Sequence, residues 1–286
     1  MFVDDLIFDV GCNNGDDTDF YLRKGFRVVA IDADRQLCDQ VSKRFADEIA
    51  LARCTVVWGA VADRGGESVE FHICNELSDW NTVDPYFVER NKKAGKTYRT
   101  VSVPTINVAD IMETQGTPYY LKIDVEGADA VPLKNLQGRA SIPPNVSIEI
   151  ALSDLSSGLE QIRLMKDLGY TQFNFFNQGM RRMVKAPNPA REGKYAVFDA
   201  QAITTGLFGE ELGGRWLTAS EAEKRFTGIF KRHALFRDHK LYSKDGKFGG
   251  TLISKIHNRL RRHLLGDPVA WYELHARTGE ARRSAT

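Results

Sequence analysis

The strongest constraint on the fold is a glycine-rich turn near the N-terminus, which separates an apolar run from a polar helix start. Residues 6–10 are apolar except for one aspartate, residues 11–15 begin and end with glycine, and residues 16–18 are polar. A strand, a glycine loop and a helix are the first half of a βαβ unit. A second apolar run, residues 27–32, predicts the next strand, and residues 35–50 are expected to form its helix. This pattern predicts a parallel sheet.

Similar apolar segments continue along the chain. Further strands are predicted at residues 55–61, 68–73, 101–108, 119–124, 146–150, 173–176 and 195–198, with a helix near 157–168. Near-continuous apolar strands that alternate with helices are typical of a mostly parallel sheet covered on both faces. The sequence therefore predicts an α/β fold.

The pattern becomes helical and basic from about residue 217. Helices are predicted at residues 219–236, 252–265 and 269–276. Residues 215–286 carry 16 Lys/Arg and 7 Asp/Glu, although the whole chain has a net charge of only +1, so the preceding part is acidic. We predict a domain at residues 1–216 and a basic helical extension at residues 217–286. Such an extension binds an anionic partner or packs on the acidic body, and we favour packing.

Composition narrows the class of protein. The chain has 286 residues, of which 42% are hydrophobic and 27% charged, values that exclude disordered, collagen-like and coiled-coil proteins. No run of 18 apolar residues occurs, and the first residues lack the basic start and apolar core of a signal peptide. The four cysteines show neither CxxC pairing nor metal-ligand spacing with histidine, which predicts reduced thiols. We expect a cytoplasmic protein without a membrane span.

The glycine turn and the acid after the second strand indicate a cofactor that contains a nucleoside. Asp32 lies 21 residues after Gly11, the separation expected of a carboxylate that binds ribose hydroxyls. The dinucleotide pattern G-x-G-x-x-G would need glycine at Asn13 and Asp16, and the acids Asp16 and Asp17 disfavour a pyrophosphate at the helix start. S-adenosylmethionine, with a cationic amine and a sulfonium, suits this acidic turn better than NAD. A purely structural role for the turn is the alternative.

The segment LKIDVEGAD at residues 121–129 places two acids directly after an apolar strand. Together with DVGCNNGDDT at residues 9–18, it resembles the FkbM family of S-adenosylmethionine-dependent methyltransferases, over roughly residues 6–150. The family often has Glu-Pro where this chain has Asp32-Ala33, and its hallmark segment ends in Glu where this chain has Asp129. An acid is retained at both positions.

The resemblance implies a class I methyltransferase fold, a Rossmann-like three-layer sandwich with a mostly parallel seven-stranded sheet and an antiparallel last strand. It also implies O-methylation of a small molecule or glycan. The residues that would bind S-adenosylmethionine are Asp9, Gly11, Asn13, Gly15 and Thr18 at the methionine end, Asp32 and Ala33 at the ribose, Ala60 and Val61 at the adenine, and Asp124 facing the methyl group.

A hydroxyl acceptor would benefit from a general base. The candidates are Asp124, Glu126, Glu149 and His72, in that order; Asp124 and Glu126 have helix capping as an alternative role, and His72 alternates with apolar neighbours like a core or edge residue. No metal site is predicted, although Asp124, Glu149 and Asn174 at successive strand ends would suit a divalent ion as an alternative.

Acceptor recognition is assigned to aromatic and amide side chains. Trp80 and Asn81, together with Asn174 and Asn177, suit stacking and hydrogen bonding to a saccharide, with loop packing as the alternative. The glycine-rich residues 204–216 are a candidate lid. We expect a small-molecule or saccharide acceptor and no nucleic-acid partner, and a homo-oligomer is left open.

Two other functions fit parts of the sequence. A nucleotide-dependent oxidoreductase or epimerase is disfavoured by the broken glycine pattern. A non-catalytic module that binds an anionic polymer through its basic C-terminal helices is disfavoured by the acids at residues 124–126, for which a pure scaffold has no use.

Overall fold

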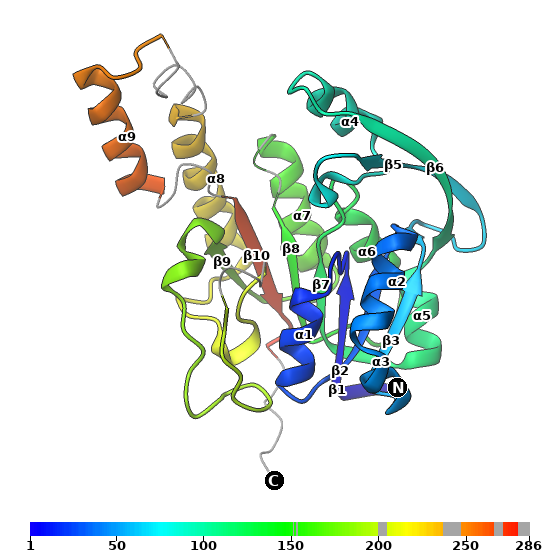
Figure 1. Ribbon diagram of the computed structural model, residues 1–286. Coiled ribbons are helices and arrows are strands. Elements are labelled where there is room, and N and C mark those ends of the chain that lie inside the picture. The colour runs from blue at the N-terminus through cyan, green and yellow to red at the C-terminus, as the bar shows by residue number, and fades with distance from the viewer. Residues whose placement is uncertain (151, 153, 200–204, 237–246, 266–270, 280–286) are drawn as a thin grey trace.

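The protein is built around a seven-stranded sheet with helices on both faces (Figure 1). The computed structural model describes residues 1–150, 152, 154–199, 205–236, 247–265 and 271–279. The strand order is β3-β2-β1-β7-β8-β10-β9, and β10 is antiparallel to both β8 and β9. The predicted sheet, with its antiparallel last strand in chain order, is confirmed. The strands are β1 (Phe2–Val10), β2 (Arg27–Asp32), β3 (Cys54–Trp58), β7 (Thr117–Ile123), β8 (Asn145–Glu149), β9 (Gln172–Asn177) and β10 (Tyr272–Arg277).

Each face of the sheet has its own hydrophobic core, because successive side chains of a strand point to opposite faces. Phe8 and Val10 of β1 pack into one core, whereas Ile7 packs into the other. The first core lies beneath α5 (Val108–Gln115), α6 (Ala130–Asn135), α7 (Leu155–Asp167) and α8 (Ala219–Phe236). The second lies beneath α1 (Asp16–Arg23) and α2 (Arg35–Arg44), which the short α3 (Ala46–Ala50) follows.

On the face of the sheet that carries the second core, part of the cover is chain without regular secondary structure. Phe208 is fully buried and stacks on Tyr120 of β7, with ring centroids 4.6 Å apart. Nearby, Lys24 and Glu211 form a fully buried ion pair of 2.8 Å. The prediction of a lid at residues 204–216 is therefore wrong for residues 205–212, which pack into the core; residue 204 lies outside the described residues. Residues 195–198 are also irregular, so the strand predicted there is wrong.

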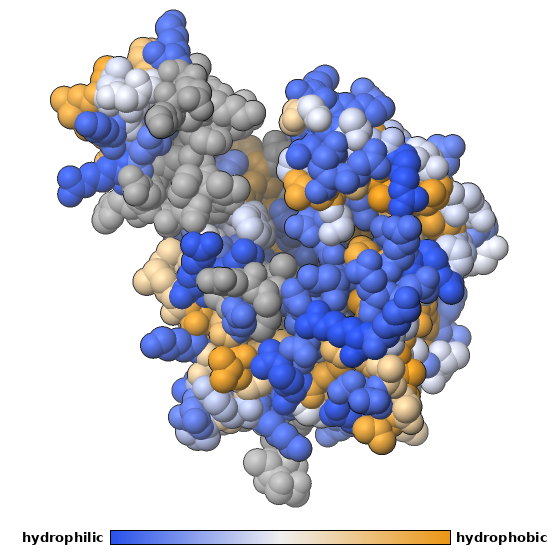
Figure 2. Space-filling model, viewed as in Figure 1, coloured by the Kyte–Doolittle hydropathy of each residue, from blue (hydrophilic) through white to orange (hydrophobic). Residues whose placement is uncertain are grey.

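An arm rises beyond the carboxyl ends of the central strands (Figure 1). It contains a small sheet of order β4-β6-β5, made of β4 (Ala60–Val61), β5 (Ser68–Cys74) and β6 (Tyr98–Ile106). Between β5 and β6 lie a 3-10 turn (Ser78–Trp80) and α4 (Pro85–Lys92). In the space-filling view, the arm and the region of α9 (Leu252–Leu265) stand apart as two projections (Figure 2).

The C-terminal part returns to the sheet. The helices predicted at residues 219–236 and 252–265 are confirmed as α8 and α9, but the helix predicted at 269–276 is wrong where the structure describes it, because Tyr272–Arg277 is strand β10. Tyr272, Leu274 and Ala276 alternate into the first core, a period of two that favours a strand. The boundary at residue 216 stays a prediction. In the described part of the chain, no helix has the length and apolarity needed to cross a membrane.

Candidate functional site

The glycine loop lies at the carboxyl end of β1 and touches the end of β7. The N–H groups of Gly11 and Cys12 both donate to the carbonyl oxygen of Ile31, at 2.9 and 3.0 Å. Gly11 has a φ of 80°, and a Cβ added there would lie 1.7 Å from the carbonyl oxygen of Asp124. Only glycine permits this approach, so the loop and the start of the acidic segment are fixed against each other.

Asp32, at the end of β2, is held by the backbone of two loops. The Asn13 N–H donates to Oδ2 and the Asp34 N–H donates to Oδ1, both at 2.8 Å. Burial raises the pKa of Asp32 to about 6, although these two hydrogen bonds oppose the shift. Ala33, the next residue, accepts a 3.0 Å hydrogen bond from the Trp58 indole. The carboxylate is oriented without a cationic partner at contact distance among the ion pairs of the described residues.

A buried ion-pair network underlies the loop. Lys122 of β7 lies 3.0 Å from Asp9, 3.7 Å from Asp124 and 3.8 Å from Asp17, and it donates to the Gly11 carbonyl at 2.8 Å. Burial lowers the pKa of Lys122, but the three carboxylates outweigh it and hold the pKa well above its ordinary value.

Two predicted cofactor residues belong to this network. Asp9 and Thr18 are fully buried and are joined by a hydrogen bond of 2.6 Å from the hydroxyl to the carboxylate. Both therefore lie beneath the loop and support it from within the protein. Gly15 closes the loop with a φ of 81°, and a Cβ there would meet Phe45 at 2.8 Å.

Three carboxylates converge beyond β7 and β8. One oxygen each of Asp124, Glu126 and Glu149 lies within 4.8 Å of the others. Burial raises the pKa of Asp124 although Lys122 opposes it, and burial followed by repulsion from Asp124 raises the pKa of Glu126 to about 8. Burial, then Asp124 and Glu126, raise the pKa of Glu149 well above its usual range. The three predicted catalytic acids are therefore brought together.

The raised pKa of Glu126 predicts a pH-dependent stability. The folded-state pKa of Glu126, about 8, exceeds the ordinary value of 4.5, so the folded protein binds a proton on this carboxyl group more tightly than the unfolded chain does. The contribution of that proton to the free energy of unfolding is complete below pH 4.5 and is lost as the pH rises towards 8. We expect Glu126→Gln to be more stable than the wild type at pH 8 by up to about 4 kcal/mol, and nearly equal to it at pH 4.5. Urea unfolding in EDTA across this range measures the difference. Glu160→Gln, which removes an exposed glutamate of α7, is the control. If the free energy of unfolding depends on pH with the same slope in the wild type and in both variants, the prediction is contradicted.

The arm reaches the glycine loop through polar contacts. Asn13 donates to Asp79 at 2.6 Å and accepts from the Ser78 hydroxyl at 3.2 Å. Asn81 accepts from the Cys74 N–H at 2.9 Å and donates to Asp34 at 3.1 Å, so both ends of its amide are bonded within the protein. The Lys96 ammonium lies over the half-buried Trp80 ring at 5.4 Å from its centroid.

Other predicted residues lie away from the acids. Asn174 is buried, pairs with His275 deep in the sheet and donates to the Gly213 carbonyl at 3.0 Å. The structure therefore does not bring Asn174 to Asp124 and Glu149, as the alternative divalent-ion site required. The third residue beside these two carboxylates is Glu126. Asn177 donates to the Tyr272 hydroxyl at 3.2 Å. His72 lies in the arm, with its Nδ1 2.9 Å from the Thr100 hydroxyl.

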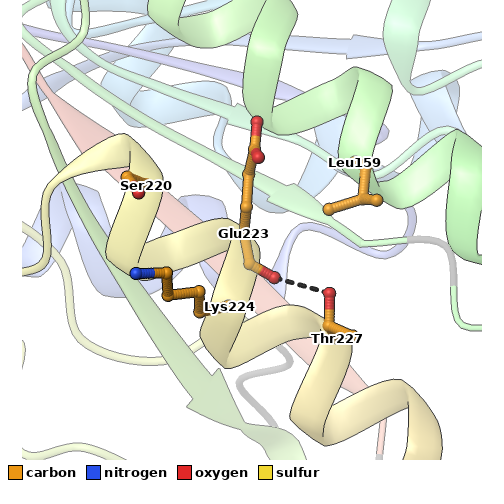
Figure 3. Close-up of a pocket in the computed structure, with 5 residues that line it drawn as sticks. All are labelled: Leu159, Ser220, Glu223, Lys224 and Thr227. Carbon is orange, nitrogen blue, oxygen red and sulfur yellow. Dashed lines mark hydrogen bonds between the residues drawn. The ribbon is translucent and has the colours of Figure 1, made fainter.

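Ala60 and Val61, predicted beside the adenine, are buried in β4, just after the end of β3. A surface depression of about 310 Å³ lies elsewhere, between α7 and α8 (Figure 3). Two of the polar side chains that line it are bonded within the protein: Thr227 donates to the Glu223 carbonyl, and the Glu223 carboxylate pairs with Arg163. None of the predicted site residues lines this depression.

Sequence reasoning missed two members of the site. Lys122 is a single lysine within an apolar strand segment. A lysine buried in such a strand requires an oppositely charged partner, and this signal could have identified it. Glu273 is buried beside Glu149 in the β8–β10 pairing, but the helix predicted there concealed it.

The charges of the site fit a cationic ligand. Asp32, Asp79 and Asp124 lie around the loop, whereas Arg44, at the end of α2, is paired with Asp16 at the start of α1, at 2.6 Å. A phosphate would face repulsion here, but a sulfonium and an ammonium would be attracted. The residues therefore fit S-adenosylmethionine and do not fit a dinucleotide.

The chain matches a known sequence family. The sequence model of the methyltransferase FkbM domain matches residues 9–171. No curated protein sequence matches the chain. Among solved structures, the chain is similar to precorrin-6y C5,15-methyltransferase from Geobacter metallireducens GS-15, with 13% identity, a TM-score of 0.33, and 61% of this chain and 68% of that chain covered. It is also similar to YjhP from E. coli, with 11% identity, a TM-score of 0.30, and coverage of 98% and 87%.

The family match spans more than half of the chain. It includes the glycine loop, Asp32, the arm and the carboxylates that follow β7 and β8. This chain belongs to the methyltransferase FkbM domain family.

Proposed function

We propose that the protein transfers a methyl group from S-adenosylmethionine to a hydroxyl group of a small-molecule or saccharide acceptor. The observation that carries the proposal is the meeting, at one edge of the sheet, of the glycine loop, the backbone-held Asp32 and the three carboxylates. The first two suit a nucleoside that ends in an amino acid. The carboxylates suit the removal of a proton from an acceptor.

Binding is assigned to the loops that follow β1, β2 and β3. Gly11, Asn13 and Gly15 would hold the methionine end, while Asp9 and Thr18 fix the loop from beneath. Asp32 accepts one backbone hydrogen bond on each oxygen and keeps further lone pairs for ribose hydroxyls. The adenine is assigned to Ala33, Ala60 and Val61.

The reaction requires alignment and proton removal. S-adenosylmethionine, when bound, supplies a methyl group on an activated sulfonium. The protein must hold an acceptor oxygen in line with that methyl group and exclude water, which is worth several powers of ten in rate. Asp124 is the first candidate for the base because it leaves β7 beside the glycine loop, followed by Glu126 and Glu149.

Acceptor recognition is assigned to Trp80. Trp80 belongs to the turn that also contacts Asn13, so a ring stacked on a saccharide there would lie beside the cofactor loop. Asn81, Asn174 and Asn177 all make structural hydrogen bonds, which favours a supporting role for the three amides. Localisation in the cytoplasm stays a prediction.

Calorimetric titration with S-adenosylhomocysteine, and separately with NAD, tests the cofactor. We expect S-adenosylhomocysteine to bind at about micromolar strength and NAD to give no response. Asp32→Ala should weaken binding at least tenfold, because a carboxylate that bonds two hydroxyls contributes about 1.5–3 kcal/mol for each. Asp110→Ala, which removes an exposed acid of α5, should bind like the wild type.

Binding of neither ligand by the folded wild type would contradict the proposal. The basic C-terminal helices would then become the leading feature, and salt-sensitive retention on heparin would favour the anionic-polymer alternative. A response to NAD alone would favour the oxidoreductase alternative.

A further inference from the structure

Glu273 is a buried carboxylate that the proposed methyl transfer does not use. Its side chain is 3% exposed, and its Oε2 atom has no hydrogen-bond partner among the described residues. In the antiparallel pairing of β10 with β8, Glu273 lies directly opposite Glu149. A buried carboxylate oxygen without a partner is costly, so this position needs an explanation.

The side chain of Glu273 leaves the sheet on the same face as those of Glu149 and Asp124. Leu274, Ile148 and Ile123 all enter the first core, so the residues that alternate with them leave the sheet on the opposite face. Glu273 of β10 and Glu149 of β8 share that opposite face, and Asp124, the residue directly after β7, continues the alternation on the neighbouring strand. Asp124 is also the charge that acts most strongly on Glu273.

The positive charges facing this group are fewer than the negative ones. Lys122 lies 3.7 Å from Asp124, but its closer partners are Asp9 at 3.0 Å and the Gly11 carbonyl at 2.8 Å. Arg90 of α4 attracts Glu126 from the arm. Asp129 and Asp79 add further negative charge nearby.

The spacing of the carboxylates suits one small ion. Ligand oxygens 2.0–2.6 Å from a shared Mg²⁺ or Ca²⁺ lie at most about 4–5 Å from one another, and hard divalent cations prefer oxygen ligands. One oxygen from each of Asp124, Glu126 and Glu149 lies within 4.8 Å of the others, a spacing that fits Ca²⁺ directly and needs a small inward shift for the shorter bonds of Mg²⁺. The end of β8 and the bend after β7 therefore offer three ligands on one side of the ion. The other side of the ion is left to water or to an acceptor.

We propose that Asp124, Glu126 and Glu149 bind a hard divalent cation, and that Glu273 strengthens the site as a further negative charge behind Glu149. This inference deepens the proposed function, on which its catalytic meaning rests. A cation held here would bind the oxygen of the acceptor hydroxyl and lower its pKa, which makes proton removal easier at neutral pH.

Titration of EDTA-treated and dialysed protein with Mn²⁺ alone tests the site, with free Mn²⁺ followed by electron paramagnetic resonance. We expect one saturable site per chain, displaced by Mg²⁺ or Ca²⁺. Glu149→Gln should weaken Mn²⁺ binding at least tenfold, and Glu273→Gln should weaken it by a smaller factor. Glu160→Gln, which removes an exposed glutamate of α7, should leave it unchanged.

Folding and function are checked separately. Circular dichroism and a thermal melt show whether each variant is folded. If Glu149→Gln fails to fold, Glu273→Gln still tests the site, because it leaves all three proposed ligands in place. Absence of a saturable site in the wild type, or equal affinity in all variants, overturns the inference. S-adenosylhomocysteine binding in EDTA then distinguishes the cases: binding without Mn²⁺ affinity rejects the metal site alone, whereas Mn²⁺ affinity without S-adenosylhomocysteine binding rejects the proposed function.

Discussion

Replacing Asp124 by asparagine is expected to lower kcat for methyl transfer by about 10²–10⁴-fold, the range that a positioned general base contributes. Asparagine keeps the shape of the side chain but cannot take up the acceptor proton. In the wild type assayed in EDTA, without a bound cation, burial raises the pKa of Asp124, so the rate should increase with pH as this carboxyl group loses its proton. The variant should lose that limb of the pH profile.

The measurement is steady-state transfer of a labelled methyl group to an acceptor identified by screening hydroxyl compounds. Binding of S-adenosylhomocysteine and the melting temperature should be measured on the same sample, so that loss of activity is not confused with loss of the fold. Glu160→Gln again serves as the charge control. A kcat within tenfold of the wild type, with the pH profile retained, would remove Asp124 as the base and transfer the role to Glu149.

The local pattern around the glycine loop was enough to predict the first half of the fold. A turn with glycine at both ends after an apolar strand left few conformations, and Gly11 does adopt the left-handed backbone that such a turn requires. Asp32 could be predicted as the cofactor-binding acid because the segment between it and Gly11 has the length of one helix and one strand. The convergence of Asp124 and Glu149 followed from the rule that parallel strands end at the same edge.

The C-terminal strand was missed because its partners are far away in sequence. Residues 272–277 contain good helix formers such as Leu274 and Ala276, and a local pattern of six residues does not tell an isolated turn of helix from a strand. The pairing with β8, more than 100 residues earlier, decides between them. Asn174 was misplaced for a related reason: its position along β9 relative to the sheet edge depends on the β10 register.

The role of Lys122 also depends on tertiary structure. Its partners come from β1, from α1 and from the bend after β7, and no spacing along the chain predicts that they meet. Local sequence shows only that a buried lysine must have a partner. The network is therefore a determinant of stability that the sequence alone did not reveal.

Lys122→Met is expected to lower the free energy of unfolding at pH 7 by about 3–5 kcal/mol, as happens when one member of a buried ion pair is removed. Methionine fills a similar volume, so the loss would come from Asp9, which is fully buried and, among the described residues, would keep only the hydrogen bond from Thr18. The Gly11 carbonyl would also lose its donor. Urea unfolding at pH 7 measures the change, and the loss should be smaller at acid pH, where Asp9 is protonated.

The double variant Asp9→Asn/Lys122→Met separates the charge from the packing. Because asparagine is neutral, the double variant should recover at least 1 kcal/mol relative to Lys122→Met, which is a coupling energy typical of residues in direct contact. Asp110→Asn/Lys122→Met, in which the second change is an exposed acid, should recover nothing. If Lys122→Met costs less than about 1 kcal/mol, or if both double variants behave alike, the ion pair does not hold the loop, and the hydrogen bond from Thr18 to Asp9 becomes the main support.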